Sequence, residues 1–232
     1  RPLPLGLIPL MEGADAVSTL EELEEWWALG LRVIGPAWAG TRYSGGTGDP
    51  GPLTDDGRVL LDIMADLGFI LDLSHMDEKA ALEALDRYEG NLIASHSNAK
   101  ALLPHTTSNR HLSDRTIRGI IERGGVIGVI PFNLFLQTGW ERSAGREHIS
   151  LQHLIAHIDY ICQIAGDAKH VGIGSDFDGG FGVESVPKEI NSIADLQKLT
   201  PLLVERGYTG ENIAAIFGQN FIHHLEKSLP RS

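Results

Sequence analysis

Six short apolar runs along this chain are each long enough for a buried strand, and helical patterns separate them. Such runs are typical of strands buried on both faces of a parallel sheet. Alternating strands and helices favour a parallel sheet with helices outside it. The expected strands are Leu7–Met11, Leu31–Gly35, Phe69–Leu73, Asn91–Ser95, Val126–Pro131 and Val171–Ser175. The expected helices are Val17–Leu29, Thr54–Asp66, Asp77–Tyr88, Ser113–Arg123, Leu151–Ala165, Ile193–Glu205, Gly210–Phe217 and Gln219–Lys227.

The number of strand–helix units limits the fold. An α/β barrel closes with eight units, and six can be counted here, with surplus helices at the end. We expect a (β/α)8 TIM barrel of the metal-dependent hydrolase type, forming a single domain over residues 1–232 with its first two units absent from this chain. About a hundred upstream residues would carry those units in the native protein. Two alternatives stay open: the units come from another chain, or the sheet is open.

Histidines and acids stand where the apolar runs end. Glu12 follows the first run, His75 the third and His96 the fourth, and Asp176 and Asp178 follow the last. The carboxyl ends of parallel strands are where an α/β barrel builds its active site. We therefore expect these side chains to share one site.

The residue types in this set indicate a metal-assisted hydrolase. Glu12, His75 and His96 supply one carboxylate and two imidazoles, a ligand set that suits zinc and also admits other divalent ions. Such an ion lowers the pKa of a water molecule towards neutrality. Asp176 could take the proton of that water and pass it to the leaving group. Each histidine taken singly is better explained as a strand-end residue bonded to backbone, but the set favours a metal.

Charge and cysteine content narrow the partners and the compartment. The net charge of −12 argues against nucleic acid or an anionic membrane surface as the main partner. No stretch is apolar enough for a membrane span, and the first residues do not resemble a signal peptide. The single cysteine excludes an internal disulfide and fits a reducing compartment, so we expect a cytoplasmic protein. A homodimer is left open.

Several ordered motifs resemble those of the renal (membrane) dipeptidase family, peptidase family M19. They are Leu10–Gly13, Asp72–His75, Ser95–Ser97, Asn109–His111 and Gly174–Gly179. Each motif alone is weak, but their order and spacing make the resemblance specific. It implies a (β/α)8 barrel with a two-zinc centre that hydrolyses dipeptides, including ones with a D-residue at the C-terminal position.

The resemblance also implies roles for individual residues. Glu12 corresponds to the glutamate that bridges both zincs, and His75 and His96 to the histidines of the second zinc. Arg110 stands where the family binds the terminal carboxylate of the substrate, which suits the forked guanidinium. Asp176 corresponds to the catalytic aspartate.

Two departures from the family pattern affect the expected site. The His-x-Asp pair of the first zinc is missing near the start, and the matching letters at His157–Asp159 lie mid-helix, so we interpret them as coincidental. The first zinc site is therefore expected to be incomplete in this chain. A substrate-contacting histidine is also missing after the second strand, where Trp38 is nearest in register.

These departures leave two alternatives to a dipeptidase. Trp38 motivates a metal-dependent amidohydrolase that acts on another amide, a lactam or a lactone. The missing first-strand ligands motivate a non-catalytic barrel remnant that serves in binding or as a scaffold. A substrate panel separates the first alternative from a dipeptidase, and metal analysis separates the second.

Overall fold

The computed structural model describes residues 6–229 of the chain. These residues fall into two compact units. The first unit contains the chain up to Ile93 together with its last residues from Lys227, and the second unit contains Ala94–Glu226. The single-domain organisation expected for residues 1–232 stays a prediction. Among the described residues, no helix combines the length and the apolar character needed to cross a membrane.

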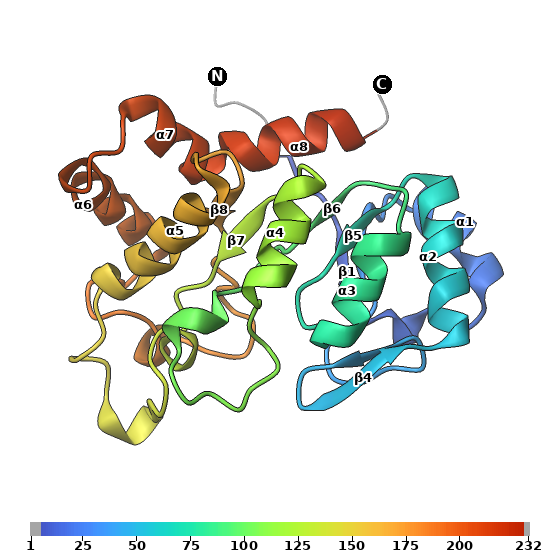
Figure 1. Cartoon of the computed structure of the whole chain (residues 1–232), viewed down its shortest axis with the longest axis horizontal. Coiled ribbons are helices and arrows are strands. Elements are labelled where there is room, and N and C mark those ends of the chain that lie inside the picture. Colours follow the sequence, from blue (N-terminus) through green and yellow to red (C-terminus); the bar gives the residue numbers. More distant parts are fainter. Residues whose placement is uncertain (1–5, 230–232) are drawn as a thin grey trace. The chain divides into compact units, whose positions relative to one another are not determined.

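The first unit is built on a four-stranded parallel sheet with the order β1-β2-β5-β6 (Figure 1). The central strands β2 and β5 are buried along their whole length, as the unbroken apolar runs predicted. Glu12 is the last residue of β1 and pairs in register with Gly35, the last residue of β2. The strands are β1 (Leu10–Glu12), β2 (Val33–Gly35), β5 (Ile70–Asp72) and β6 (Leu92–Ile93).

Helices of the first unit begin at side-chain caps that the sequence supplies. Thr54 caps α2 (Asp55–Leu67) by accepting a hydrogen bond from the backbone N–H of Gly57 at 3.0 Å. Asp77 caps α3 (Glu78–Arg87) in the same way, which turns the chain into a helix directly after β5. The expected helix Val17–Leu29 is shorter: a 3-10 turn at Leu20–Glu22 precedes α1 (Leu23–Ala28).

The glycine-rich stretch between β2 and α2 contains an antiparallel hairpin. Its strands are β3 (Ser44–Gly46) and β4 (Asp49–Leu53). β4 contains two prolines, which donate no hydrogen bond to a sheet. A two-stranded ribbon has open edges, so the prolines are tolerated. Figure 1 shows the hairpin at one end of α3, which it contacts.

The second unit continues the alternation of strands and helices. Ala94, the residue after β6, forms a parallel bridge with Ile127, and β7 pairs in parallel with β8. The predicted helix Ile193–Glu205 begins as a 3-10 helix over Ile193–Lys198. The elements are α4 (Asp114–Glu122), β7 (Ile127–Val129), α5 (Leu151–Ala165), β8 (Val171–Ile173), α6 (Leu199–Glu205), α7 (Gly210–Ala214), a π-helix over Ala215–Gln219, and α8 (Asn220–Ser228), whose last residues belong to the first unit.

The strand order confirms the α/β class. All six expected strands are present and pair in parallel, although each is shorter than its apolar run. The prediction of a buried strand is wrong for the first run, because β1 ends one residue beyond that run and is largely exposed. Within residues 6–229 the strands do not form a closed barrel.

Candidate metal and substrate site

A carboxylate and an imidazole meet at the carboxyl end of the first unit's sheet. Oε1 of Glu12, at the end of β1, lies 3.1 Å from Nε2 of His75, which follows β5 by three residues. The His75 side chain is 10% exposed and that of Glu12 is 37% exposed. The predicted pairing of strand-end residues is thus present for these two, and the partly open carboxylate can be reached from outside.

The His75 ring is held on two further sides. Its Nδ1 lies 3.0 Å from the hydroxyl of Thr47, in the turn of the β3–β4 hairpin. The Trp38 ring stacks on it with a centroid distance of 5.8 Å and an interplanar angle of 26°. Trp38 is 58% exposed, so its ring covers a candidate ligand and still faces solvent.

His96 belongs to the second unit and follows β6 by three residues, as His75 follows β5. It is buried, and its Nδ1 lies 2.7 Å from the Ser95 hydroxyl. In both histidines a hydroxyl therefore engages Nδ1. That arrangement favours Nε2 as the ligating nitrogen, because the partner of one ring nitrogen sets the role of the other.

Arg110 is buried beneath this segment of the second unit and is 3% exposed. Its guanidinium donates to the carbonyl oxygen of His96 at 2.6 Å and to the Ser97 hydroxyl at 2.8 Å. The guanidinium also lies over the Phe135 ring, 5.4 Å from its centroid. Arg110 thus supports the backbone of a candidate metal ligand, which the sequence motif did not indicate.

The segment after β8 has an unusual backbone. Asp176 and Asp178 have φ values of 49° and 70°, in the left-handed region that residues other than glycine seldom adopt. The backbone N–H of Gly179 donates to the carbonyl oxygen of Asp176 at 2.9 Å. A Cβ added at Gly179 would lie 2.1 Å from Oδ1 of Asp176. The carboxylate predicted to be catalytic therefore packs against the Gly179 backbone and would have to shift if this residue carried a side chain.

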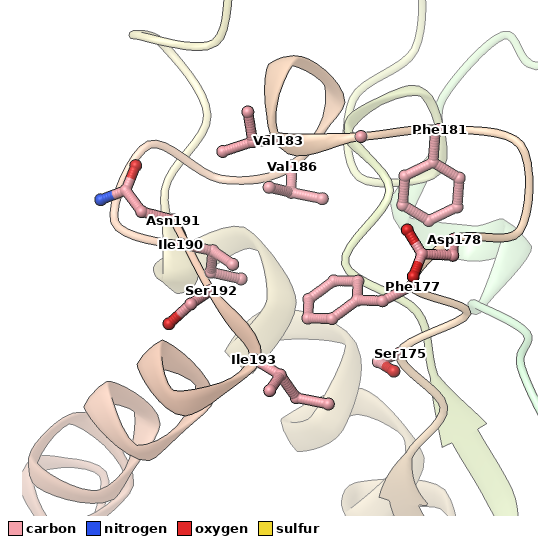
Figure 2. Close-up of a pocket in the computed structure, with 11 residues that line it drawn as sticks. Ser175, Phe177, Asp178, Phe181, Val183, Val186, Ile190, Asn191, Ser192 and Ile193 are labelled. Carbon is pink, nitrogen blue, oxygen red and sulfur yellow. The ribbon is translucent and has the colours of Figure 1, made fainter.

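A cavity of about 430 Å³ opens beside this turn, within the second unit. Figure 2 shows the Phe177 ring directed into it, with Asp178 and Phe181 on one side and residues 190–193 on the other. Most lining side chains are apolar, and polar groups stand among them, which is the usual make-up of a small-molecule site. The lining residues are Ser175, Phe177, Asp178, Phe181, Gly182, Val183, Val186, Ile190, Asn191, Ser192 and Ile193.

Two other histidines of the second unit are buried and kept neutral. Burial, and next the charge of Arg110, lowers the pKa of His111 to about 3. Burial, and next the charge of His153, lowers the pKa of His157 to about 4. His157 lies within α5, and its Nδ1 accepts a hydrogen bond from the backbone N–H of Ala99 at 3.2 Å. This structural role agrees with the interpretation of His157–Asp159 as a coincidental match.

The sequence did not identify the hydroxyl groups that hold the candidate ligands. Thr47 is 28 residues from His75 in a stretch without periodic pattern, so no sequence signal links them. Ser95 is adjacent to His96 within a quoted motif, and that adjacency was the available signal. Ser97 is the third residue of that motif and accepts from Arg110.

Comparison with known proteins places these residues in a family context. The family model described as membrane dipeptidase (peptidase family M19) matches residues 5–228. An uncharacterised protein encoded in the pqqA 5′ region of Klebsiella pneumoniae is 34% identical over 96% of this chain and 82% of its own length. The dipeptidase tcpJ of Claviceps purpurea is 31% identical over 75% of this chain and 38% of its own length.

A solved structure shares the fold. A metallo peptidase from Rhodobacter sphaeroides, liganded with a phosphinate mimic of the dipeptide L-Ala-D-Ala, superposes with a TM-score of 0.83 at 32% sequence identity. The match covers 96% of this chain and 63% of that protein, so this chain spans less than two thirds of its length.

Proposed function

Because the chain belongs to the membrane dipeptidase family, peptidase family M19, we propose that it acts as a zinc-dependent dipeptidase. The observation that carries this proposal is the pair of Glu12 and His75. Their carboxylate and imidazole lie 3.1 Å apart at the ends of two strands of one parallel sheet. An anionic oxygen and an imidazole nitrogen at this spacing are suited to share one divalent ion.

We propose that His96 is the third ligand. β5 and β6 are paired in parallel, and each histidine follows its strand by three residues, so the chain directions favour bringing both rings to one edge. Together the three residues offer one carboxylate oxygen and two imidazole nitrogens. This donor set fits zinc, and the hydroxyl beside each Nδ1 can accept the N–H of a ligating ring, as the outer partners of metal-bound histidines do.

The remaining roles belong to residues of the second unit. A bound zinc ion would supply a water molecule acidic enough to attack a peptide carbonyl near neutral pH. Asp176 would accept the proton of the attacking water and deliver it to the leaving amine. Arg110 would bind the terminal carboxylate of the substrate, for which its planar fork is suited. The (β/α)8 barrel of the family is proposed for the whole protein on the same ground.

The substrates proposed are short peptides, including dipeptides with a D-residue at the C-terminal position. The dipeptide mimic bound by the Rhodobacter sphaeroides relative supports this choice. Trp38 supports a second candidate, an amidohydrolase acting on another amide or a lactam, because an exposed aromatic ring replaces a histidine that contacts the substrate in the family. A non-catalytic remnant is the third candidate.

The test combines metal analysis with a substrate panel. After incubation with zinc, the protein should retain bound zinc. Its kcat/KM for L-Ala-L-Ala or L-Ala-D-Ala should be higher than its kcat/KM for lactams. Asp176→Asn should keep the zinc and lower kcat by about 10²- to 10⁴-fold, because only proton transfer is removed. His96→Ala should lose zinc, whereas the control His148→Ala, at an exposed histidine, should keep it.

Each candidate has its own outcome in this experiment. Bound zinc without cleavage of either dipeptide, but with cleavage of a lactam, would favour the amidohydrolase. A protein that retains no divalent ion after incubation with zinc would favour the remnant.

A further inference from the structure

We propose that Thr47 is a positioning residue for the metal ligand His75, because its hydroxyl sets which ring nitrogen carries the proton and directs the other towards the metal. The inference rests on the proposed metal site and adds to it a residue outside the quoted motifs. All residues in the argument belong to the first unit.

Backbone hydrogen bonds hold the hairpin that carries Thr47 against two other segments, at Trp38 and at Met76–Asp77. The backbone N–H of Thr47 donates to the carbonyl oxygen of Trp38 at 3.0 Å. The backbone N–H of Asp77 donates to the carbonyl oxygen of Gly45 at 3.0 Å, and Gly46 forms an antiparallel bridge with Met76. These bonds fix the hairpin turn against residues 75–77, so the Thr47 hydroxyl is held in place before any metal binds.

Thr47 contacts both the ring and the backbone of His75. Its Oγ1 lies 3.0 Å from Nδ1 and 3.3 Å from the carbonyl oxygen of the same residue. A hydroxyl has one proton to donate and accepts through its lone pairs. If the hydroxyl donates to the carbonyl oxygen, Nδ1–H must donate to Oγ1, and Nε2 then presents a lone pair.

The opposite arrangement is also accommodated by these contacts. If the hydroxyl donates to Nδ1, the proton of the neutral ring is on Nε2, which then donates to Oε1 of Glu12 at 3.1 Å. Zinc binds the lone pair of a neutral imidazole nitrogen, so only the first arrangement is competent. We therefore expect the zinc-loaded protein to carry the His75 proton on Nδ1, with the Thr47 hydroxyl donating to the carbonyl oxygen.

The backbone of His75 explains why such support is needed. Its φ is 68°, a left-handed conformation that persists in a residue other than glycine only when the surroundings hold it. The Trp38 ring restrains the face of the imidazole but gives no preference for either nitrogen. Thr47 contacts Nδ1 and Glu12 contacts Nε2, so we expect the direction of the Thr47 hydroxyl to decide between the two arrangements.

The test compares three variants by zinc affinity, measured by competition with a chelator. Thr47→Val keeps the shape of the side chain and removes the hydroxyl, so the Kd for zinc should rise about 10- to 100-fold. Thr47→Ser restores a hydroxyl and should return the Kd to near that of the unaltered protein. Thr41→Val is the matched control, because the Thr41 hydroxyl donates to the Pro36 carbonyl oxygen at 2.7 Å within the same loop. Its Kd should be unchanged.

A spectroscopic readout separates proton placement from general loosening. ¹⁵N NMR of the His75 ring should show Nδ1–H in the zinc-loaded protein, and Thr47→Val should broaden or shift that signal. A Thr47→Val protein that melts normally and binds zinc as tightly as the unaltered protein would overturn this proposal alone, as would an equal loss in Thr41→Val. Absence of zinc binding by the unaltered protein would overturn the proposed function, and this inference with it.

Discussion

Arg110 illustrates how a buried charge can serve two purposes at the scale of one residue. It is expected to bind the substrate carboxylate, and its guanidinium also bonds to the His96 carbonyl oxygen and the Ser97 hydroxyl. A guanidinium presents five donors in a planar fork that matches the two oxygens of a carboxylate. A lysine ammonium is a single point charge and cannot reproduce the fork.

We expect Arg110→Lys to raise KM for L-Ala-L-Ala about 10- to 100-fold, because a hydrogen bond to a charged group contributes about 1.5–3 kcal/mol. Steady-state kinetics on the zinc-loaded protein would measure this, with Arg118→Lys on the exposed side of α4 as the control. An unchanged KM together with weaker zinc binding would instead mean that Arg110 acts only through His96.

At the scale of elements, the segment that follows β8 combines the Asp176 turn with the apolar cavity. Ile193 lines the cavity and is 66% exposed, so its replacement should not disturb folding. A cavity of this composition, next to the turn that carries the proposed catalytic Asp176, is suited to an apolar substrate side chain.

Ile193→Asp should therefore lower kcat/KM for dipeptides with leucine or phenylalanine by about tenfold. Lost apolar contact in a substrate pocket raises the activation free energy that determines kcat/KM by about 1–3 kcal/mol. The kcat/KM for L-Ala-L-Ala should change less. The control is Val204→Asp, an equally conspicuous exposed apolar residue on α6 that does not line the cavity. An equal loss for small and large dipeptides would contradict a role for the cavity in specificity.

At the scale of the whole molecule, His111 and His157 make stability depend on pH. Their folded-state pKa values are lowered to about 3 and about 4, so both rings are neutral in the folded protein at neutral pH. The unfolded chain takes up their protons once the pH falls below about 6.5. The free energy of unfolding should therefore decrease from about pH 6.5 downwards, to about pH 4 for His157, by at most about 1.4 kcal/mol per pH unit for each group.

Replacement of His157 by glutamine should reduce this dependence, because glutamine offers an acceptor for the Ala99 N–H but takes up no proton. Urea unfolding at pH 7 and pH 5 would show a smaller difference in the free energy of unfolding than in the unaltered protein. The exposed control His148→Gln should leave the difference as it was. A difference in His157→Gln as large as in the unaltered protein would show that other groups govern the acid sensitivity.

The sequence by itself determined the alternation of strands and helices and the strand-end positions of Glu12, His75, His96 and Asp176. Apolar periodicity is a local property of the chain, and parallel strands end at one edge of their sheet, so both features can be predicted without coordinates. The ordered motifs also indicated the family that the comparison with known proteins confirmed.

Only the tertiary structure decided which side chains support the ligands. The hydroxyl of Thr47 reaches His75 across 28 residues because the hairpin folds back and bridges to Met76, and no period in the sequence encodes that path. The bonds of Arg110 to the His96 segment and the packing of the Asp176 carboxylate against Gly179 were likewise set by the tertiary structure. Such contacts join residues that are far apart in sequence and depend on the path of the loops in the folded protein. Strands and helices, by contrast, follow from the spacing of apolar residues along a short stretch of chain.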